Sequence, residues 1–306
     1  METHDIGLWT ILIAVLGGAV RVGTPFIFVS LGECLTEKSG RINLGLEGNL
    51  VMGAMVGYAV SYLFGSPWLG VLAACGAGCV LGLIHALLCQ NKKVNDIAVG
   101  IAMMLFATGV AFFYGKPFIQ PSAPRLPSIN LGMWSDSPVI RAALDINALF
   151  FLGVLLAPFI TWFLIHTRSG NTLRVVGESS DAALALGMNI NKVRLLSTMA
   201  GGGLAGIGGS YLSLYYPGSW SEGLSSGQGL MAVALVIFAR WNPMNCLYAS
   251  LLFGAAAALG PALQSVGLTW GYYLFNAAPY VLTLAIMVFT SSNKSTLNGM
   301  PGEFSK

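Results

Sequence analysis

The sequence predicts an all-α protein, built as a polytopic bundle of transmembrane helices. Lys, Arg, Asp and Glu together make up only 9% of the 306 residues, against about 25% in a soluble domain. Hydrophobic residues reach 55%, and the mean hydropathy is +0.73. The apolar stretches are continuous and do not alternate with polar residues, which argues against a transmembrane β-barrel. So few charges cannot cover a water-exposed surface, and the composition therefore speaks against a soluble enzyme.

The apolar stretches define about nine candidate spans, and we expect residues 1–306 to form a single transmembrane domain. The seventh stretch, 230–239, is short, because a crossing helix needs about 20 residues. We therefore expect the loop before it to dip into the membrane as a re-entrant segment. The stretches are 7–31, 44–64, 67–89, 97–115, 146–165, 195–214, 230–239, 245–266 and 271–290.

The distribution of basic residues predicts the orientation of the bundle. One alternating set of connections holds eleven of the 15 Lys and Arg residues, whereas the other set holds only Lys116, Arg125 and Arg141. The positive-inside rule places the richer set in the cytoplasm. We therefore expect the N-terminus outside and the C-terminus inside, as an odd number of spans requires.

Two connections are long. Residues 116–144 contain five prolines, and we expect them to form an irregular external cap. Residues 167–194 are expected in the cytoplasm. There, Ser179-Ser180-Asp181 supplies N-cap residues, Ala182–Leu186 are helix formers, and Gly187 is a C-cap candidate. This pattern predicts a short surface helix, for which a specific docking role and an ordinary connector helix are both open.

Two motifs resemble enzyme signatures without the context that these require. Gly201-Gly-Gly-Leu-Ala-Gly206 fits a dinucleotide fingerprint but follows no strand, so we interpret it as close helix packing through Gly202 and Gly206. Gly223-Leu-Ser-Ser-Gly227 fits a nucleophile elbow, yet all three histidines precede it, in the wrong order for a hydrolase.

Other ligand classes are not expected either. Without a Walker A sequence, the chain should not hydrolyse ATP by itself. The scattered cysteines, including Cys75 and Cys79, lack partners for a metal, so we expect no metal and no other cofactor. A net charge of +3 does not indicate nucleic-acid binding.

Ionisable residues gather around the first predicted cytoplasmic turn. Glu33, Glu37 and Glu47 flank Lys38 and Arg41, and charge at membrane depth is costly unless it is paired or faces a polar path. Asn43 and Glu47 lie four residues apart and would share one face of a helix. A translocation path and a structural cluster of ion pairs, with Glu47 bound to Arg41 or Lys38, are both open.

Two aromatic residues are expected at the outer membrane interface. Tyr216 and Trp220 stand beside Pro217 and Gly218. They fit an aromatic belt, or a surface on which a ring-bearing solute stacks as it enters the path.

Taken together, the motifs resemble the permease subunits of bacterial ABC importers for simple sugars and nucleosides. The most specific stretch is Glu37-Lys-Ser-Gly-Arg-Ile-Asn-Leu-Gly-Leu-Glu-Gly48. Within this family, the chain looks like the shorter of two paralogous permeases. The resemblance spans nearly the whole chain, through Arg21-x-x-Thr24-Pro25, Gly32-Glu33, Arg168-Ser-Gly170, Gly177-Glu178, Ala182-Ala183, Gly187-Met-Asn189, Tyr216-Pro-Gly218, Gly223, Gly227, Ile237-Phe-Ala-Arg-Trp-Asn-Pro243 and Leu252-Phe-Gly254.

The resemblance implies a type II ABC importer permease of the bacterial inner membrane, surrounded by lipid. Its partners would be a second permease, a separate ABC ATPase and a solute-binding lipoprotein docked on the outer loops. The 167–194 loop would seat its short helix in a groove of the ATPase. Small side chains would let the helix enter the groove, so a bulky acidic residue in place of Ala183 is expected to uncouple transport. The coupling residues implied are Gly177, Glu178, Asp181, Ala182, Ala183 and Gly187.

The function expected is ATP-driven import of a nucleoside or simple sugar. A branched-chain amino acid permease, from the same superfamily, is the alternative. A self-sufficient secondary transporter or channel would show internal repeats and coupling carboxylates at mid-membrane, whereas the acidic residues here lie near one membrane face.

Overall fold

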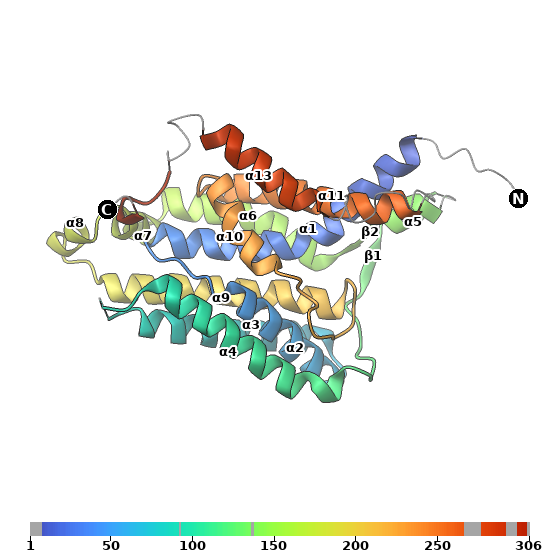
Figure 1. The fold of residues 1–306 in the computed structure, drawn as a ribbon, viewed down its shortest axis with the longest axis horizontal. Coiled ribbons are helices and arrows are strands. Elements are labelled where there is room, and N and C mark those ends of the chain that lie inside the picture. The colour runs from blue at the N-terminus through green and yellow to red at the C-terminus, as the bar shows by residue number, and fades with distance from the viewer. Residues whose placement is uncertain (1–7, 92, 136–137, 266–276, 292–298, 305–306) are drawn as a thin grey trace, which may run out of the picture.

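The computed structural model describes residues 8–91, 93–135, 138–265, 277–291 and 299–304, which form a helical bundle with one short sheet (Figure 1). The all-α class is thereby confirmed. The elements are α1 (Leu8–Lys38), α2 (Leu46–Phe64), α3 (Pro67–Leu88), α4 (Asp96–Gly115), η1 (Lys116–Phe118), β1 (Ser128–Asn130), α5 (Pro138–Ala143), β2 (Asp145–Asn147), α6 (Ala148–His166), α7 (Arg168–Glu178), α8 (Ser180–Ala185), α9 (Ile190–Leu214), α10 (Gln228–Phe238), α11 (Pro243–Ser265), α13 (Ala278–Ser291) and η3 (Gly302–Phe304).

Each predicted span overlaps a helix, but their number is not established. Five described helices, α1, α3, α4, α6 and α11, are long and apolar enough to cross a membrane. The helix α10, with 11 residues, is too short for a full crossing. Residue 7, residue 266 and residues 271–276 of the predicted spans lie outside the described residues.

Polar side chains fix where several helices begin. In four helices, the side chain of the residue before the helix accepts a hydrogen bond from a backbone N–H of the first turn, over 2.8–3.0 Å. These residues are Asn95 before α4, Asn147 before α6, Thr167 before α7 and Asn189 before α9. The helix α2 ends at Gly65, whose φ of +70° is readily adopted only by glycine. Caps of this kind satisfy backbone groups that a helix end leaves free.

The two ends of the bundle differ. The two-stranded sheet and α5 mark one end, called the sheet end below. The helices α7 and α8 mark the other, called the α8 end (Figure 1). At the sheet end, β1 pairs antiparallel with β2, with Ser128 opposite Asn147. The prediction of an irregular cap at 116–144 was therefore wrong in part, because residues 128–130 form the strand β1. The Asn147 side chain donates to Pro127 O (2.7 Å) and helps hold the two strands together.

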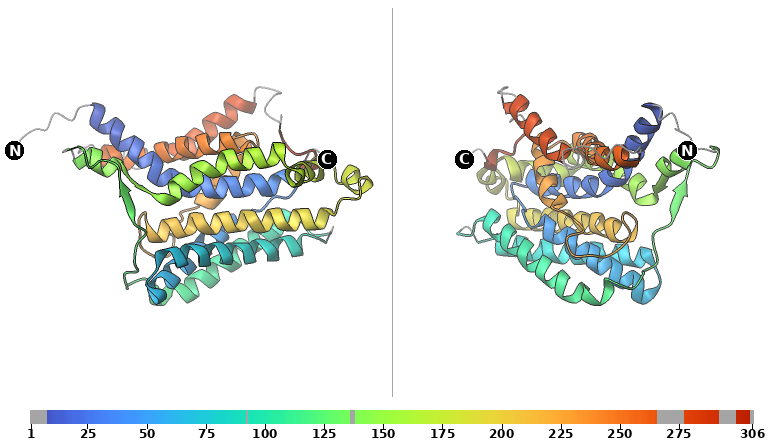
Figure 2. Two further views of the ribbon diagram at one scale, coloured as in Figure 1. Left: turned by 180° about the vertical axis from the view of Figure 1, so that it is seen from behind. Right: turned by 45° about the vertical axis from the view of Figure 1, so that its right-hand side comes forward.

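The helix α9 is the centre of the bundle. It lies between α2, α3 and α4 on one side and α1, α6 and α11 on the other (Figures 1 and 2). A Cβ atom added at Gly202 would lie 2.3 Å from Gly78 O, and one at Gly206 would lie 2.2 Å from Ala74 O. This backbone-to-backbone contact confirms the interpretation of Gly201–Gly206 as a packing motif, because it lies in the middle of a continuous helix.

The outward faces of α3, α4 and α6 are apolar. Leu72, Leu105, Phe106 and Leu155 are all exposed on them. An exposed apolar surface of this kind fits contact with lipid and is unfavourable in water.

Candidate functional site

The predicted short helix is present as α8. Ser179 Oγ accepts a hydrogen bond from Ala182 N–H (3.3 Å), and this caps the N-terminus. At the other end, Gly187 has a φ of +71°, and Met188 N–H donates to Ala183 O (2.9 Å). This is the Schellman arrangement that ends many helices at a glycine. The N-cap and C-cap predicted from sequence are both confirmed.

The side chains that α8 exposes are not those expected. Leu184 is 59% exposed and Leu186 is 67% exposed, whereas Ala183 is fully buried. The small side chain of Ala183 therefore does not serve to enter a groove, because Ala183 lies on the side of α8 that packs against the chain itself. Asp181 and Ala182 are exposed.

The preceding helix α7 leans directly on α1. A Cβ atom added at Gly177 would lie 2.1 Å from Lys38 O, so only glycine permits this approach. Gly177 is therefore buried against α1, while Glu178 is exposed at the end of α7. Together, Gly177, Ala183 and Gly187 shape the α7–α8 unit and present its exposed residues.

Glu47 lies in the first turn of α2, where it binds the N-terminus of α10. Its Oε1 accepts hydrogen bonds from Ser225 Oγ (2.5 Å) and Gly227 N–H (3.0 Å), and its Oε2 accepts one from Gly229 N–H (2.6 Å). A buried carboxylate with three donors is well satisfied. It also saturates backbone N–H groups that the membrane interior cannot hydrogen-bond.

The ion pairs expected around Glu47 are not formed. Arg41 binds Asp96 instead, over 2.5 Å, and also donates to Cys89 O. This pair joins the α1–α2 turn to the start of α4. No hydrogen bond or ion pair joins Glu47 to Arg41 or Lys38 among the residues that the structure describes.

Asn43 and Glu47 do not share a helix face, because α2 begins only at Leu46. Asn43 lies in the turn before α2, where its backbone N–H donates to Glu33 Oε1 (2.8 Å). Its side-chain oxygen accepts from Gly45 N–H (2.9 Å). The spacing of four residues was therefore misleading, because the prediction assumed that Asn43 is part of the helix, whereas the chain turns there.

The segment between α9 and α11 runs from one end of the bundle to the other. At the sheet end, Tyr215 Oη donates to Asp145 O (2.9 Å). At the α8 end, the Trp241 indole donates to Glu37 in the last turn of α1. Between them, residues 215–227 are irregular and only α10 is helical. The irregular stretch is thus followed by a short helix, while the entry of this loop into the membrane stays a prediction.

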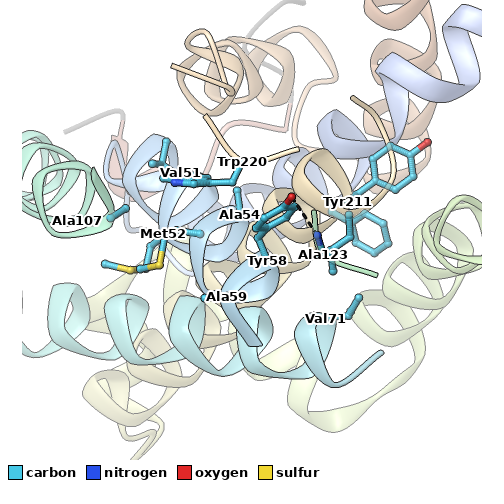
Figure 3. Close-up of a cluster of buried hydrophobic side chains, with 14 of the residues drawn as sticks. Val51, Met52, Ala54, Tyr58, Ala59, Val71, Ala107, Ala123, Tyr211 and Trp220 are labelled. Carbon is cyan, nitrogen blue, oxygen red and sulfur yellow. Dashed lines mark hydrogen bonds between the residues drawn. The ribbon is translucent and has the colours of Figure 1, made fainter. Parts of the chain in front are cut away.

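The two aromatic residues of this segment have different environments. Trp220 is 2% exposed and lies beside Val51 in the core formed with α2 and α4 (Figure 3). Its assignment to an outer aromatic surface was wrong, because the indole fills the space left by Gly115. Tyr216 is 37% exposed and lines a cavity of about 370 Å³ together with Arg21.

Comparison with known proteins identifies the family. Residues 15–291 match the family described as branched-chain amino acid transport system / permease component. The chain belongs to this permease family. The permease is 32% identical over 291 residues to a putative glucose ABC transporter permease protein of Haloferax volcanii, covering 94% of this chain and 87% of the relative. It is 31% identical over 318 residues to a guanosine ABC transporter permease protein of Bacillus subtilis, with coverages of 95% and 97%.

A third relative is a nucleoside ABC transporter permease protein of Lactococcus lactis, 30% identical over 281 residues, with coverages of 86% and 88%. A second guanosine ABC transporter permease protein of Bacillus subtilis and a second nucleoside ABC transporter permease protein of Lactococcus lactis also match this chain. The resemblance inferred from the motifs is confirmed. The relatives are described as permease proteins of ABC transporters, and none of the three is described as a secondary transporter.

Sequence reasoning missed two contacts of this permease. It did not find the hydrogen bonds between Glu47 and the N-terminus of α10. A signal for them exists, because Gly227 and Gly229 have no side chains that would keep a carboxylate away from their backbone N–H groups. It also missed Glu303, which lies against α8 and for which the sequence carries no signal.

Proposed function

We propose that this permease subunit forms, with a second permease, the membrane path of an ATP-driven importer for a nucleoside or simple sugar. The observation that carries this proposal is α8, a capped helix that exposes leucines at one end of a lipid-facing bundle. Exposed leucines on a short helix suit a groove in a partner protein. The relatives named above, for glucose, guanosine and nucleosides, favour these solutes over a branched-chain amino acid.

In this proposal, α8 couples the permease to a separate ABC ATPase. Leu184 and Leu186 would enter the groove, with Glu178, Asp181 and Ala182 at its rim. Gly177, Ala183 and Gly187 would hold α8 in shape from within. Hydrolysis of ATP belongs to the partner, and the permease transmits its movement.

The bundle would span the inner membrane of a bacterium, with the α8 end facing the cytoplasm. Supporting this orientation, the α8 end carries Lys38, Arg174, Lys192, Arg194 and Arg240, as the positive-inside rule requires. The N-terminus would then lie outside, and the sheet end would receive a solute-binding lipoprotein.

The solute path would begin at the cavity lined by Arg21 and Tyr216 and continue along the irregular segment before α10. Two buried polar atoms, Asn43 Nδ2 and Trp220 Nε1, have no hydrogen-bond partner among the described residues, and water or solute in the path would supply one. Tyr216 would contact the solute directly. Glu47 would hold the N-terminus of α10, and thus one wall of the path, in place.

The test of coupling is a pair of matched leucine substitutions. Leu184→Glu places a charge on the exposed face of α8, whereas Leu131→Glu places the same charge at the sheet end, where Leu131 is also exposed. Each variant is co-expressed with the ATPase and the second permease of the same transporter, and the tagged complex is purified. We expect Leu184→Glu to lose most of the bound ATPase and Leu131→Glu to retain it. Full retention by both variants would overturn the coupling role of α8.

A further inference from the structure

The segment Gly299–Phe304, which ends in η3, lies against the α7–α8 unit. In Figure 1, the dark red turn η3 lies beside α7. A Cβ atom added at Gly302 would lie 2.3 Å from Glu178 O, so the segment passes in backbone contact with the end of α7. This segment is called the brace below.

One carboxylate in the brace binds the start of α8. Glu303 Oε1 accepts hydrogen bonds from both the backbone N–H and the side-chain hydroxyl of Ser180, each over 2.9 Å. Ser180 is the first residue of α8, and its N–H has no partner inside the helix. Ser179 already caps Ala182, so Glu303 satisfies a second N–H at the same terminus.

The other oxygen of this carboxylate binds the central helix. Glu303 Oε2 lies 3.3 Å from Arg194 Nη2 near the start of α9, and the Glu303 and Arg194 side chains are 16% and 15% exposed. Arg194 Nε also donates to Ser39 O (3.1 Å), just after α1. One carboxylate therefore connects α8 to α9 and, through Arg194, to the end of α1.

The brace is itself anchored in the bundle. Lys38 Nζ donates to Gly299 O (3.1 Å). Pro301 is buried, and Met300 packs on the cluster that contains Leu164 and Trp241. The position of Glu303 is thus set by the bundle and not by α8.

A helix of six residues needs such an anchor. Helices shorter than about 12 residues are marginal in water, because nucleation is costly relative to the few hydrogen bonds gained. The α8 helix exposes most of its side chains, so packing alone supports it weakly. Hydrogen bonds to a charged acceptor are roughly twice as strong as neutral ones.

We infer that Glu303 is a positioning residue for energy coupling, which holds α8 rigidly on α9 so that a displacement of α8 by the ATPase moves the bundle. This inference rests on the coupling role proposed above for α8. Without Glu303, α8 would still present its leucines to a partner, but it would move independently of α9. The ATPase would then bind and hydrolyse ATP with less transport.

The first test measures the position of α8 without any partner. Backbone hydrogen–deuterium exchange is followed at residues 180–186 in the full-length permease in lipid nanodiscs. We expect Glu303→Gln to accelerate exchange there about tenfold, which corresponds to the loss of about 1.4 kcal/mol of local stability. Ser180→Ala removes only the hydroxyl bond and should give a smaller increase. Glu222→Gln, an exposed glutamate near the sheet end, is the matched control.

The second test measures coupling in proteoliposomes that contain the whole transporter. We expect Glu303→Gln to lower the solute imported per ATP hydrolysed several-fold, with the ATPase still bound. Unchanged exchange at residues 180–186 would overturn the brace itself. Faster exchange with an unchanged transport ratio would overturn its role in coupling. Both results are independent of the test with Leu184→Glu. If the Leu184→Glu variant retained the ATPase, that result would overturn the proposed function and not the brace.

Discussion

Glu47 and Gly229 join the first turns of two helices that are far apart in the sequence. The Glu47 carboxylate accepts a hydrogen bond from Gly229 N–H over 2.6 Å, across 182 residues of chain. A Cβ atom added at Gly229 would lie 2.5 Å from the Glu47 Cα atom, so the two backbones touch. This contact fixes where the short helix α10 begins inside the bundle.

Glu47→Gln should weaken the permease measurably. An amide has one acceptor oxygen, so at least one of the donors Gly227 N–H and Gly229 N–H would be left facing the Gln NH₂ group. A buried donor without a partner costs about 1–3 kcal/mol. We expect a lower Tm in detergent and several-fold slower uptake. Ser221→Ala, at an exposed position in the same loop, should leave the Tm unchanged, and an unaltered Tm for Glu47→Gln would contradict the assigned contact.

Gly202→Ala should be strongly destabilising. The added methyl group would lie 2.3 Å from Gly78 O, and neither backbone can move without separating α9 from α3. Overpacking of this kind costs about 1–3 kcal/mol. The control is Gly109→Ala in α4, where an added Cβ meets nothing within 4 Å. There we expect unchanged or slightly higher stability, since Ala favours helix over Gly by up to about 1 kcal/mol. Equal melting temperatures for the two variants would argue against the packing of α9.

Adjacent alanines in α8 should respond in opposite ways. Ala183 is buried and Ala182 is exposed. Ala183→Leu should therefore displace α8 and accelerate its backbone exchange, while Ala182→Leu should leave exchange unchanged. Uptake should fall in both variants, in the first because α8 is distorted and in the second because the groove is obstructed. If Ala183→Leu left the exchange of α8 as it is, the inward orientation of Ala183 would be wrong.

Tyr216 and Trp220 should separate transport from stability. Trp220→Ala removes a buried indole and should cost about 3–5 kcal/mol, seen as a large drop in Tm. Tyr216→Ala removes a half-exposed ring beside the cavity and should leave Tm almost unchanged. We expect it to raise the KM for uptake of the transported nucleoside or sugar. Wild-type uptake kinetics for Tyr216→Ala would remove this residue from the path.

Local signals in the sequence predicted the elements and their ends. The caps of α8 depend only on neighbouring residues, Ser179 and Gly187, and both predictions were correct. The same holds for Gly202 and Gly206, since small residues one turn apart have few roles in an apolar helix other than packing. The apolar stretches likewise located the helices, because a lipid-facing segment must be both apolar and helical.

Partners across the bundle could not be predicted in this way. Arg41 stands closer in sequence to Glu47 than to Asp96, yet it binds Asp96 across 55 residues. Glu303 reaches Ser180 across 123 residues. Charge and spacing narrow the candidates for such bonds, but the packing of the helices decides which donors and acceptors meet. The inward orientation of Ala183 has the same origin, because it depends on what lies behind α8.

The close contacts of α9 also constrain how this permease can change shape. At Gly202, Gly206 and Gly209, its backbone meets the backbones of α3 and α2 with no side chains between them. Interfaces of this kind lack the intervening side chains whose rotamer changes would let one helix slide past another. The same holds for α1, since a Cβ atom added at Gly32 would lie 2.6 Å from Gly201 O. We therefore expect α1, α2, α3 and α9 to travel as one rigid body during transport. The hinge that lets solute through would then lie in the irregular backbone around residues 215–227, where the chain leaves that body.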